Sequence, residues 1–149
     1  MVVQVTENGR RTTNSAFRLP TSYFMPTVLI VENDTDNRLL LKIWLEMWNY
    51  RVIEAADGVE ALRLAVEHLP DLILMDVKMP LLDGLDAARA IRQSAEIGDV
   101  PIIFVSGCAE ARYRQAANEA GANGYLVKPF DFDNLLSLIA EQIAVSRPV

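Results

Sequence analysis

The stretch Leu72-Ile73-Leu74-Met75-Asp76 decides the fold, because four consecutive apolar residues end directly in an acid. Similar apolar runs occur at residues 28–31 and 102–105. A short continuous apolar run is typical of a strand buried on both faces, as in a parallel sheet covered by helices. Two shorter strand candidates lie at residues 50–54 and 125–127. The sequence therefore predicts five short strands.

Helical patterns separate these strands. Residues 35–48 place four apolar side chains on one stripe, which predicts a helix with that stripe inward and with Asp34 or Thr35 as its cap: Leu40, Ile43, Trp44 and Met47. The second helix opens at Asp57-Gly58 and is expected to bury Val59, Leu62 and Val66. Three more patterns cover residues 85–92, residues 113–120 with Gly121 as a stop, and a helix capped by Asp131 with Leu135, Leu138, Ile139 and Ile143 inward.

This alternation predicts the architecture. Five successive β-α units favour an α/β fold, with a doubly wound parallel sheet and right-handed crossovers. In such sheets ligands bind at the carboxyl ends of the strands. The residues that directly follow each strand should therefore meet in space.

Composition narrows the class of protein. The 149 residues carry a net charge of −6 and one cysteine, Cys108, and no apolar run approaches membrane-spanning length. We expect a single domain in a reducing cytoplasm, without membrane association or direct nucleic-acid binding. Residues 1–25 show no period and hold Arg10, Arg11 and Arg18 against Glu7. They are interpreted as a flexible tail, or as a basic segment that contacts an acidic partner or its own domain.

Polar residues follow four of the predicted strands, and the strand-end rule brings them to one crevice: Glu32, Asn33 and Asp34; Asp76; Ser106 and Gly107; and Lys128. A carboxylate such as Asp76 can attack a phosphoryl group to form an aspartyl phosphate. Carboxylates from Glu32 and Asp76 suit Mg²⁺, which prefers oxygen ligands. Lys128 would neutralise phosphate charge, Ser106 would donate to a phosphate oxygen, and Gly107 would let the phosphate approach closely.

Five ordered motifs give the chain a strong resemblance to response-regulator receiver domains, over about residues 26–146: Val28-Leu29-Ile30-Val31-Glu32; Leu72 to Asp76 with Met79-Pro80; Asp83-Gly84; Ser106-Gly107; and Gly124-Tyr125-Leu126-Val127-Lys128-Pro129-Phe130. The resemblance, which is to single-domain chemotaxis-regulator-like receivers, implies a flavodoxin-like sheet in the order 2-1-3-4-5. It also implies that Asp76 accepts phosphate from a histidine kinase or a histidine phosphotransfer protein, with Mg²⁺ or Mn²⁺ required.

The resemblance assigns roles by position. Glu32 and Asn33 fall on the acid pair of the metal site, and the backbone carbonyl of Lys78 falls on a metal ligand. Ser106 falls on the switch hydroxyl and Tyr125 on the switch aromatic. Lys128 falls on the family's lysine, and the Lys128-Pro129 bond is expected to be cis.

One position departs from the pattern. The family's second acid is Asn33 here, with Asp34 one residue later. An amide oxygen can still bind a metal, but one unit of charge is lost. Two interpretations follow. The chain is a working receiver, either with weaker metal affinity or with Asp34 shifted inward as a ligand. Alternatively, it is a receiver-like scaffold with weak or no phosphorylation.

We expect a stand-alone receiver without an output domain after the last helix, and such a receiver would act by binding a partner or by phosphate relay to a histidine phosphotransfer protein. The resemblance places the output surface on the fourth helix, fifth strand and fifth helix, around Arg112, Tyr113, Tyr125 and residues 131–143, and leaves a homodimer open. An aspartyl-phosphate enzyme is disfavoured because its second acid would fall at Lys78. A flavin or nucleotide binder is disfavoured because the first strand lacks a glycine-rich loop.

Overall fold

The computed structural model describes residues 25–146, and the predicted tail lies outside them except for Met25. Its five strands are β1 (Thr27–Val31), β2 (Arg51–Ala55), β3 (Leu72–Met75), β4 (Ile102–Ser106) and β5 (Gly124–Val127). Its five helices are α1 (Thr35–Met47), α2 (Gly58–His68), α3 (Gly84–Arg92), α4 (Ala111–Glu119) and α5 (Phe132–Ser146). The predicted alternation is confirmed.

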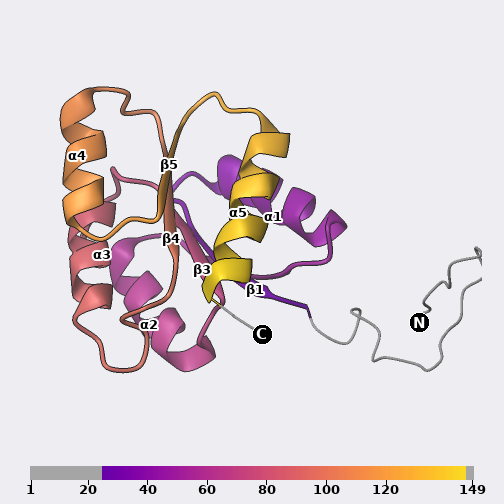
Figure 1. Ribbon diagram of the computed structural model, residues 1–149, viewed down its shortest axis with the longest axis horizontal. Helices are drawn as coiled ribbons and strands as arrows, with labels where there is room; N and C mark the ends of the chain where they lie inside the picture. The colour runs from indigo at the N-terminus through magenta and orange to yellow at the C-terminus, as the bar shows by residue number, and fades with distance from the viewer. Residues whose placement is uncertain (1–24, 147–149) are drawn as a thin grey trace, which may run out of the picture.

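The strands form one parallel sheet in the order β2-β1-β3-β4-β5. Helices α1 and α5 lie on one side of the sheet, and α2, α3 and α4 lie on the other (Figure 1). Alternate residues of the central strands feed two separate cores, with Ile73 and Phe104 in one and Leu72 and Ile103 in the other. This doubly covered sheet explains why the strands have no polar alternation.

Acidic side chains cap the first three helices. Asp34 accepts from the amide of Asn37, Asp57 from that of Glu60, and Asp83 from that of Asp86. Each cap satisfies an otherwise unpaired helix N–H and places negative charge at the positive end of the helix dipole. These caps fix where α1 and α3 leave the edge of the sheet that carries the candidate site.

The predicted inward face of α1 is wrong, and that of α2 is wrong at two of its three residues. In α1 the buried residues are Leu41 and Leu45, whereas Leu40 and Met47 are 54% and 71% exposed. In α2 the sheet side is formed by Gly58, Ala61 and Ala65, while Val59 and Val66 face outward. The predicted Leu62 is partly buried against the core. Both helices carry apolar residues around much of their circumference, so periodicity alone could not select the face that packs. The inward stripe of α5 was predicted correctly at Leu135, Ile139 and Ile143.

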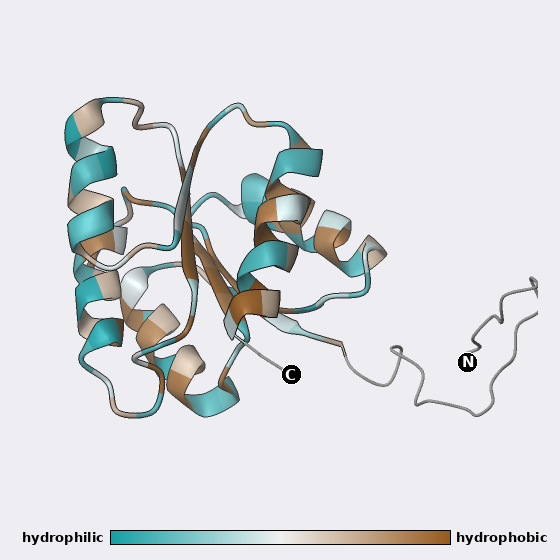
Figure 2. Ribbon diagram, in the orientation of Figure 1, coloured by the Kyte–Doolittle hydropathy of each residue, from teal (hydrophilic) through white to brown (hydrophobic). Residues whose placement is uncertain are grey.

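The strands are mainly hydrophobic, whereas the helices on both sides of the sheet combine hydrophobic and hydrophilic residues (Figure 2). Within residues 25–146, none of the helices is both long and apolar enough to cross a membrane.

Candidate functional site at the carboxyl edge of the sheet

Lys128 joins the two carboxylates of the crevice. Its Nζ lies 3.0 Å from Glu32 Oε1 and 3.4 Å from Asp76 Oδ2. The Glu32 side chain is 6% exposed and that of Asp76 is 15% exposed, so both acids are largely removed from water. A buried carboxylate is costly unless it is paired, and one ammonium here serves two. The structure therefore brings together three of the residues selected from the sequence.

Competing effects act on the ammonium of Lys128. Burial on its own would lower the pKa of this group, but the hydrogen bond to Glu32 and the charge of Asp76 outweigh burial and raise the pKa above its ordinary value of 10.5. Lys128 is therefore a permanent cation at neutral pH. Its charge lies beside Asp76 Oδ2, while Asp76 Oδ1 accepts a hydrogen bond from the Val77 amide at 2.7 Å.

Ser106 and Gly107 lie at the end of β4, next to the end of β5. The Lys128 amide donates to the Ser106 carbonyl oxygen at 2.8 Å, which ties the two strand ends together. The Ser106 side chain is buried, and its Oγ accepts from the Cys108 amide at 3.1 Å. A methyl group built at Gly107 would meet no atom within 4 Å, so open space adjoins this position. The Lys128-Pro129 bond is cis, as predicted.

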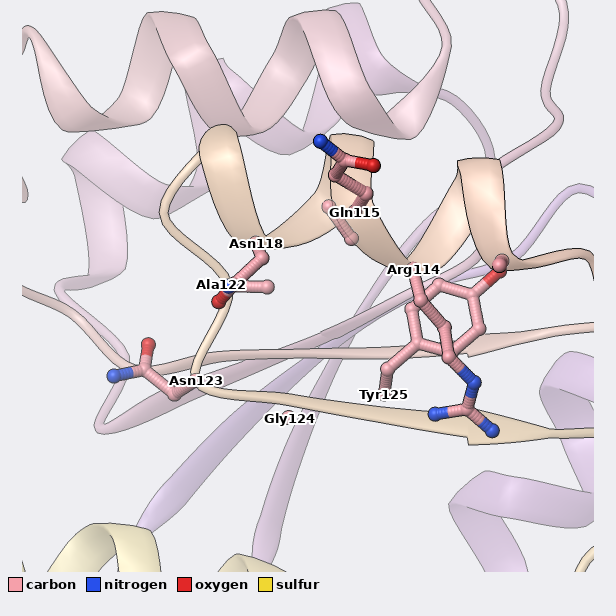
Figure 3. Close-up of a pocket in the computed structure, with 9 residues that line it drawn as sticks. Arg114, Gln115, Asn118, Ala122, Asn123, Gly124 and Tyr125 are labelled. Carbon is pink, nitrogen blue, oxygen red and sulfur yellow. The ribbon is translucent and has the colours of Figure 1, made fainter.

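Tyr125 lies between the site and an open pocket. Its hydroxyl donates to the Cys108 carbonyl oxygen at 2.6 Å, and its ring lies 6.3 Å from that of Phe104. Burial raises the pKa of the Tyr125 hydroxyl, more than nearby Ser106 lowers it, so this group stays protonated. Arg114 lies over the outer face of the ring (Figure 3). Tyr125 thus touches the loop after Ser106 and a surface residue of α4.

Asn33 and Asp34 lie on the exposed part of the β1–α1 loop. The Asp34 carboxylate accepts from the Asn37 amide at 2.8 Å, and the Asp34 amide donates to Glu32 Oε2 at 3.0 Å. Asp34 is thus placed as a helix cap rather than in the crevice. Lys78, whose backbone carbonyl was predicted as a ligand, directs its ammonium over the Tyr113 ring at 5.2 Å.

Two residues of the site region had no role in the sequence-based interpretation. Arg38 Nη1 donates to the Glu32 carbonyl oxygen at 2.8 Å, and its Nε donates to Glu54 Oε1 at 3.2 Å. Gly84 packs so closely that a side chain there would overlap the Asp76 carbonyl oxygen and come within 2.9 Å of the Phe104 ring. The sequence motif included Gly84 but did not show its contact with Asp76, and no local pattern linked Arg38 to Glu32.

The donor set suits a hard cation. Glu32 and Asp76 supply carboxylates, and Asn33 and the Lys78 backbone can supply neutral oxygens. Mg²⁺ prefers such oxygen ligands and commonly binds proteins through one or two carboxylates. Among the described residues, no group of three or more His, Cys, Asp and Glu side chains could hold a metal. With two carboxylates and neutral oxygens, the residues present still fit Mg²⁺, but with less negative charge than a site with three acids would offer.

Comparison with known proteins identifies the class. The family model for the response regulator receiver domain matches residues 28–140. The receiver domain of sensor histidine kinase PA1611 from Pseudomonas aeruginosa, solved with magnesium in its active-site cleft, has a TM-score of 0.75 and 36% identity, covering 80% of this chain and 98% of that one. Chemotaxis protein CheY4 of Vibrio cholerae has a TM-score of 0.74 and 32% identity, covering 78% and 98%.

The chain belongs to the response regulator receiver domain family. Among curated relatives, the transcriptional regulatory proteins PdtaR and PrrA of Mycobacterium tuberculosis are 42% and 40% identical to it over 121 residues. Those alignments cover 80% and 81% of this chain, but only 57% and 51% of the relatives. The chain thus spans about half the length of the curated relatives it matches.

Proposed function

We propose that this receiver domain is a phosphoacceptor that receives a phosphoryl group on Asp76 from a phosphohistidine of a histidine kinase or histidine phosphotransfer protein. The observation that carries the proposal is the contact of Lys128 with both Glu32 and Asp76 at the carboxyl edge of the sheet. A cation held beside an acceptor carboxylate is what phosphoryl transfer needs, because that reaction depends mainly on positioning and charge neutralisation.

The transfer is a displacement at phosphorus. An oxygen of the Asp76 carboxylate bonds to phosphorus as the phosphorus–nitrogen bond breaks, and the electron pair of that bond stays on the imidazole. Lys128 offsets the charge on the transferred group, and the buried Ser106 hydroxyl can turn from its Cys108 contact to donate to a phosphoryl oxygen. The free space at Gly107 admits the group without a side-chain clash. The chain thereby modifies only itself, which is why we classify it as a signalling domain and not an enzyme.

The implied metal has a place among these residues. Glu32, Asp76, the Asn33 amide and the Lys78 carbonyl would hold Mg²⁺, with Mn²⁺ as a substitute. When bound, the ion would neutralise charge on phosphoryl oxygens. The neighbour from Pseudomonas aeruginosa that holds magnesium in its cleft supports this assignment.

Tyr125 is the proposed link to an output surface on α4, β5 and α5, where a downstream protein would bind. A cavity of about 550 Å³ opens there, lined by Arg114, Gln115, Asn118 and Asn123 together with Tyr125 (Figure 3). Engagement of Ser106 by phosphate would change the Cys108 region that the Tyr125 hydroxyl contacts. The proposal includes a cytoplasmic protein that contacts neither nucleic acid nor membrane directly, and it leaves a homodimer through this surface open.

Acetyl phosphate with Mg²⁺, followed by intact mass measurement, tests the proposal. We expect a single phosphoryl adduct that is absent in Asp76→Asn and is retained in Asp34→Asn. The second variant is a matched control, because it removes an acid from the same edge while asparagine still caps α1. An adduct that persists in Asp76→Asn would refute the assignment of the acceptor.

The exposed Asn33 supports a second candidate function, a receiver-shaped scaffold with little phosphorylation. That function predicts no adduct even at high Mg²⁺ concentration, and output binding that is equal in the original chain and in Asp76→Asn. The same mass measurement therefore separates the two functions.

A further inference from the structure

The outer face of α1 carries an apolar stripe that the domain covers only in part, where the Trp44 ring packs against that of Phe132. Leu40, Ile43, Trp44 and Met47 are exposed by 54%, 47%, 36% and 71%, and Trp48 directly after the helix is 59% exposed. The first four are the residues that the sequence pattern predicted to be inward. Contiguous exposed apolar surface with large aromatic side chains usually marks an interaction site.

This stripe borders two neighbouring hollows between α1 and α5, together called the α1–α5 groove. The hollow beside the proposed phosphorylation site is called the upper hollow. It has a volume of about 300 Å³, and its lining includes Leu40, Trp44, Pro129, Phe130 and Phe132. The lower hollow, of about 400 Å³, is lined mainly by Trp48, Tyr50, Leu136 and Ala140. Helices α1 and α5 lie together on one side of the sheet (Figure 1). The groove thus leads from the start of β2 to the rim of the site.

The chain enters the domain next to the lower end of the groove. The Arg51 amide donates to the Pro26 carbonyl oxygen at 2.8 Å, and Arg51 directly follows Tyr50 in the sequence. Residues 1–24 therefore join the described domain within reach of Trp48 and Tyr50. A segment tethered so close has a high effective concentration at the groove.

The sequence before this entry point suits the groove in composition and in reach. Residues 16–24 read Ala-Phe-Arg-Leu-Pro-Thr-Ser-Tyr-Phe, which is apolar or aromatic at five of nine positions. Nine extended residues span about 30 Å, whereas the 13 residues of α1 rise about 20 Å. The N-terminal sequence carries Arg10, Arg11 and Arg18. Asp36 and Asp133 lie in the first turns of α1 and α5, and Asp133 lines the lower hollow. Length, apolar content and charge all match.

We propose that residues 16–24 occupy the α1–α5 groove of the same molecule, with Phe17 and Leu19 toward Trp44 and with Tyr23 and Phe24 toward Trp48. The upper end of the groove includes Pro129 and touches Lys128. A segment seated there covers the α1 side of the phosphorylation site and excludes from it any protein that needs the same apolar face. The N-terminal segment is then a built-in competitor for α1.

Paramagnetic labelling of the full chain tests this proposal. A nitroxide on Ser15→Cys, in a Cys108→Ser background, should erase the amide signals of Leu40 and Phe130 while sparing Leu69, which lies beyond α2 on the other side of the sheet. A segment that does not dock would sample both sides, because its roughly 11-residue tether spans about 20 Å. Equal signal loss on both sides would overturn the proposal.

Two further variants identify the residues responsible. Phe17→Ser with Leu19→Ser should restore the lost signals and raise acrylamide quenching of the fluorescence, since the chain's two tryptophans both lie in the groove. Val3→Ser with Val5→Ser removes apolar residues outside the segment and should change neither. Signal loss that appears only between labelled and unlabelled molecules in a mixed sample would assign the groove to a second copy and overturn the proposal.

Discussion

Lys128 and Asn33 both follow strands at the carboxyl edge of the sheet, yet their surroundings differ. Lys128 is held by two carboxylates and by a backbone bond between strand ends. Asn33 lies exposed on a loop whose neighbour Asp34 is committed to capping α1. The side of the site proposed to bind phosphate is therefore built by the fold before any ligand arrives. The side proposed to bind the metal, at Asn33, has no such preformed contact among the described residues. Substitutions on the two sides should therefore affect stability and metal affinity differently.

Gly84 packs against Asp76, which belongs to both sides of the site, so substitution of Gly84 should have the largest effect on stability. Gly84→Ala places a methyl group against the Asp76 carbonyl oxygen and the Phe104 ring, which must move apart. Overpacking of this kind costs about 3 kcal/mol of unfolding free energy. Urea denaturation measures the loss. The matched control is Gly107→Ala, which meets open space and should stay within about 0.5 kcal/mol of the original chain. Equal costs at the two glycines would contradict the close packing of α3 on Asp76.

Removing the preformed cation comes next in size. Lys128→Met leaves Glu32 and Asp76 without a counter-charge in a largely buried place. We expect a loss of about 2 kcal/mol, below the usual value for a fully buried pair because the Lys128 side chain is 27% exposed. Arg63→Met on α2, which removes a cation from exposed pairs with Glu60 and Glu67, should cost at most about 0.5 kcal/mol. A stability equal to that of the original chain would show that Lys128 does not hold the two acids.

The same contact predicts a pH dependence. The pKa of Lys128 is raised in the folded state above its ordinary value of 10.5, so the folded state binds this proton more tightly. The contribution is fully present below pH 10.5 and is lost as pH rises through the folded pKa. The stability difference between the original chain and Lys128→Met should stay constant from neutral pH upward and shrink only beyond that point. A difference that shrinks already between pH 7 and 9 would assign the titration to another group.

The metal side should respond through ligand affinity. Asn33→Asp restores one negative charge, and we expect Mg²⁺ to bind roughly tenfold more tightly, since unit charges about 4 Å apart in water interact by about 1 kcal/mol and the ion carries two. Calorimetric titration measures the change. Asn37→Asp adds the same charge one turn into α1 and should have a smaller effect. If both variants bind Mg²⁺ equally, Asn33 is not a ligand position.

How far the sequence predicted the molecule follows the same division. The strands and the residues after them were predictable, because continuous apolar runs identify buried strands and strand ends share one edge. The contacts of Lys128 with Glu32 and Asp76 follow from that rule. The packing faces of α1 and α2 were not predictable, because alanines form the sheet side of α2 and large apolar residues point outward in both helices. Local periodicity contains no information about which apolar face the tertiary structure selects.

Arg38 shows why parts of the site also escaped prediction. Its contacts join the loop after β1 to the edge strand β2, through the Glu32 carbonyl oxygen and the Glu54 carboxylate. The contact with Glu54 spans 16 residues, and the other is made to a backbone atom. A hydrogen bond to backbone leaves no mark in the type of the partner residue. Such contacts become visible only when the fold is known.

The smallest expected effect separates these two contacts of Arg38. Arg38→Met leaves the Glu32 carbonyl oxygen without its donor, which should cost about 1 kcal/mol and weaken Mg²⁺ binding, because this carbonyl belongs to the loop that carries Asn33. Lys42→Met is the matched control, because Lys42 also pairs with Glu54, at 3.4 Å, but within residues 25–146 makes no hydrogen bond to Glu32. Both variants lose a cation beside Glu54, so any difference in Mg²⁺ affinity between them reports the loop. Equal affinities would mean that the loop carrying Asn33 is ordered without Arg38. The reduced Mg²⁺ affinity expected of the site would then come only from the charge missing at Asn33.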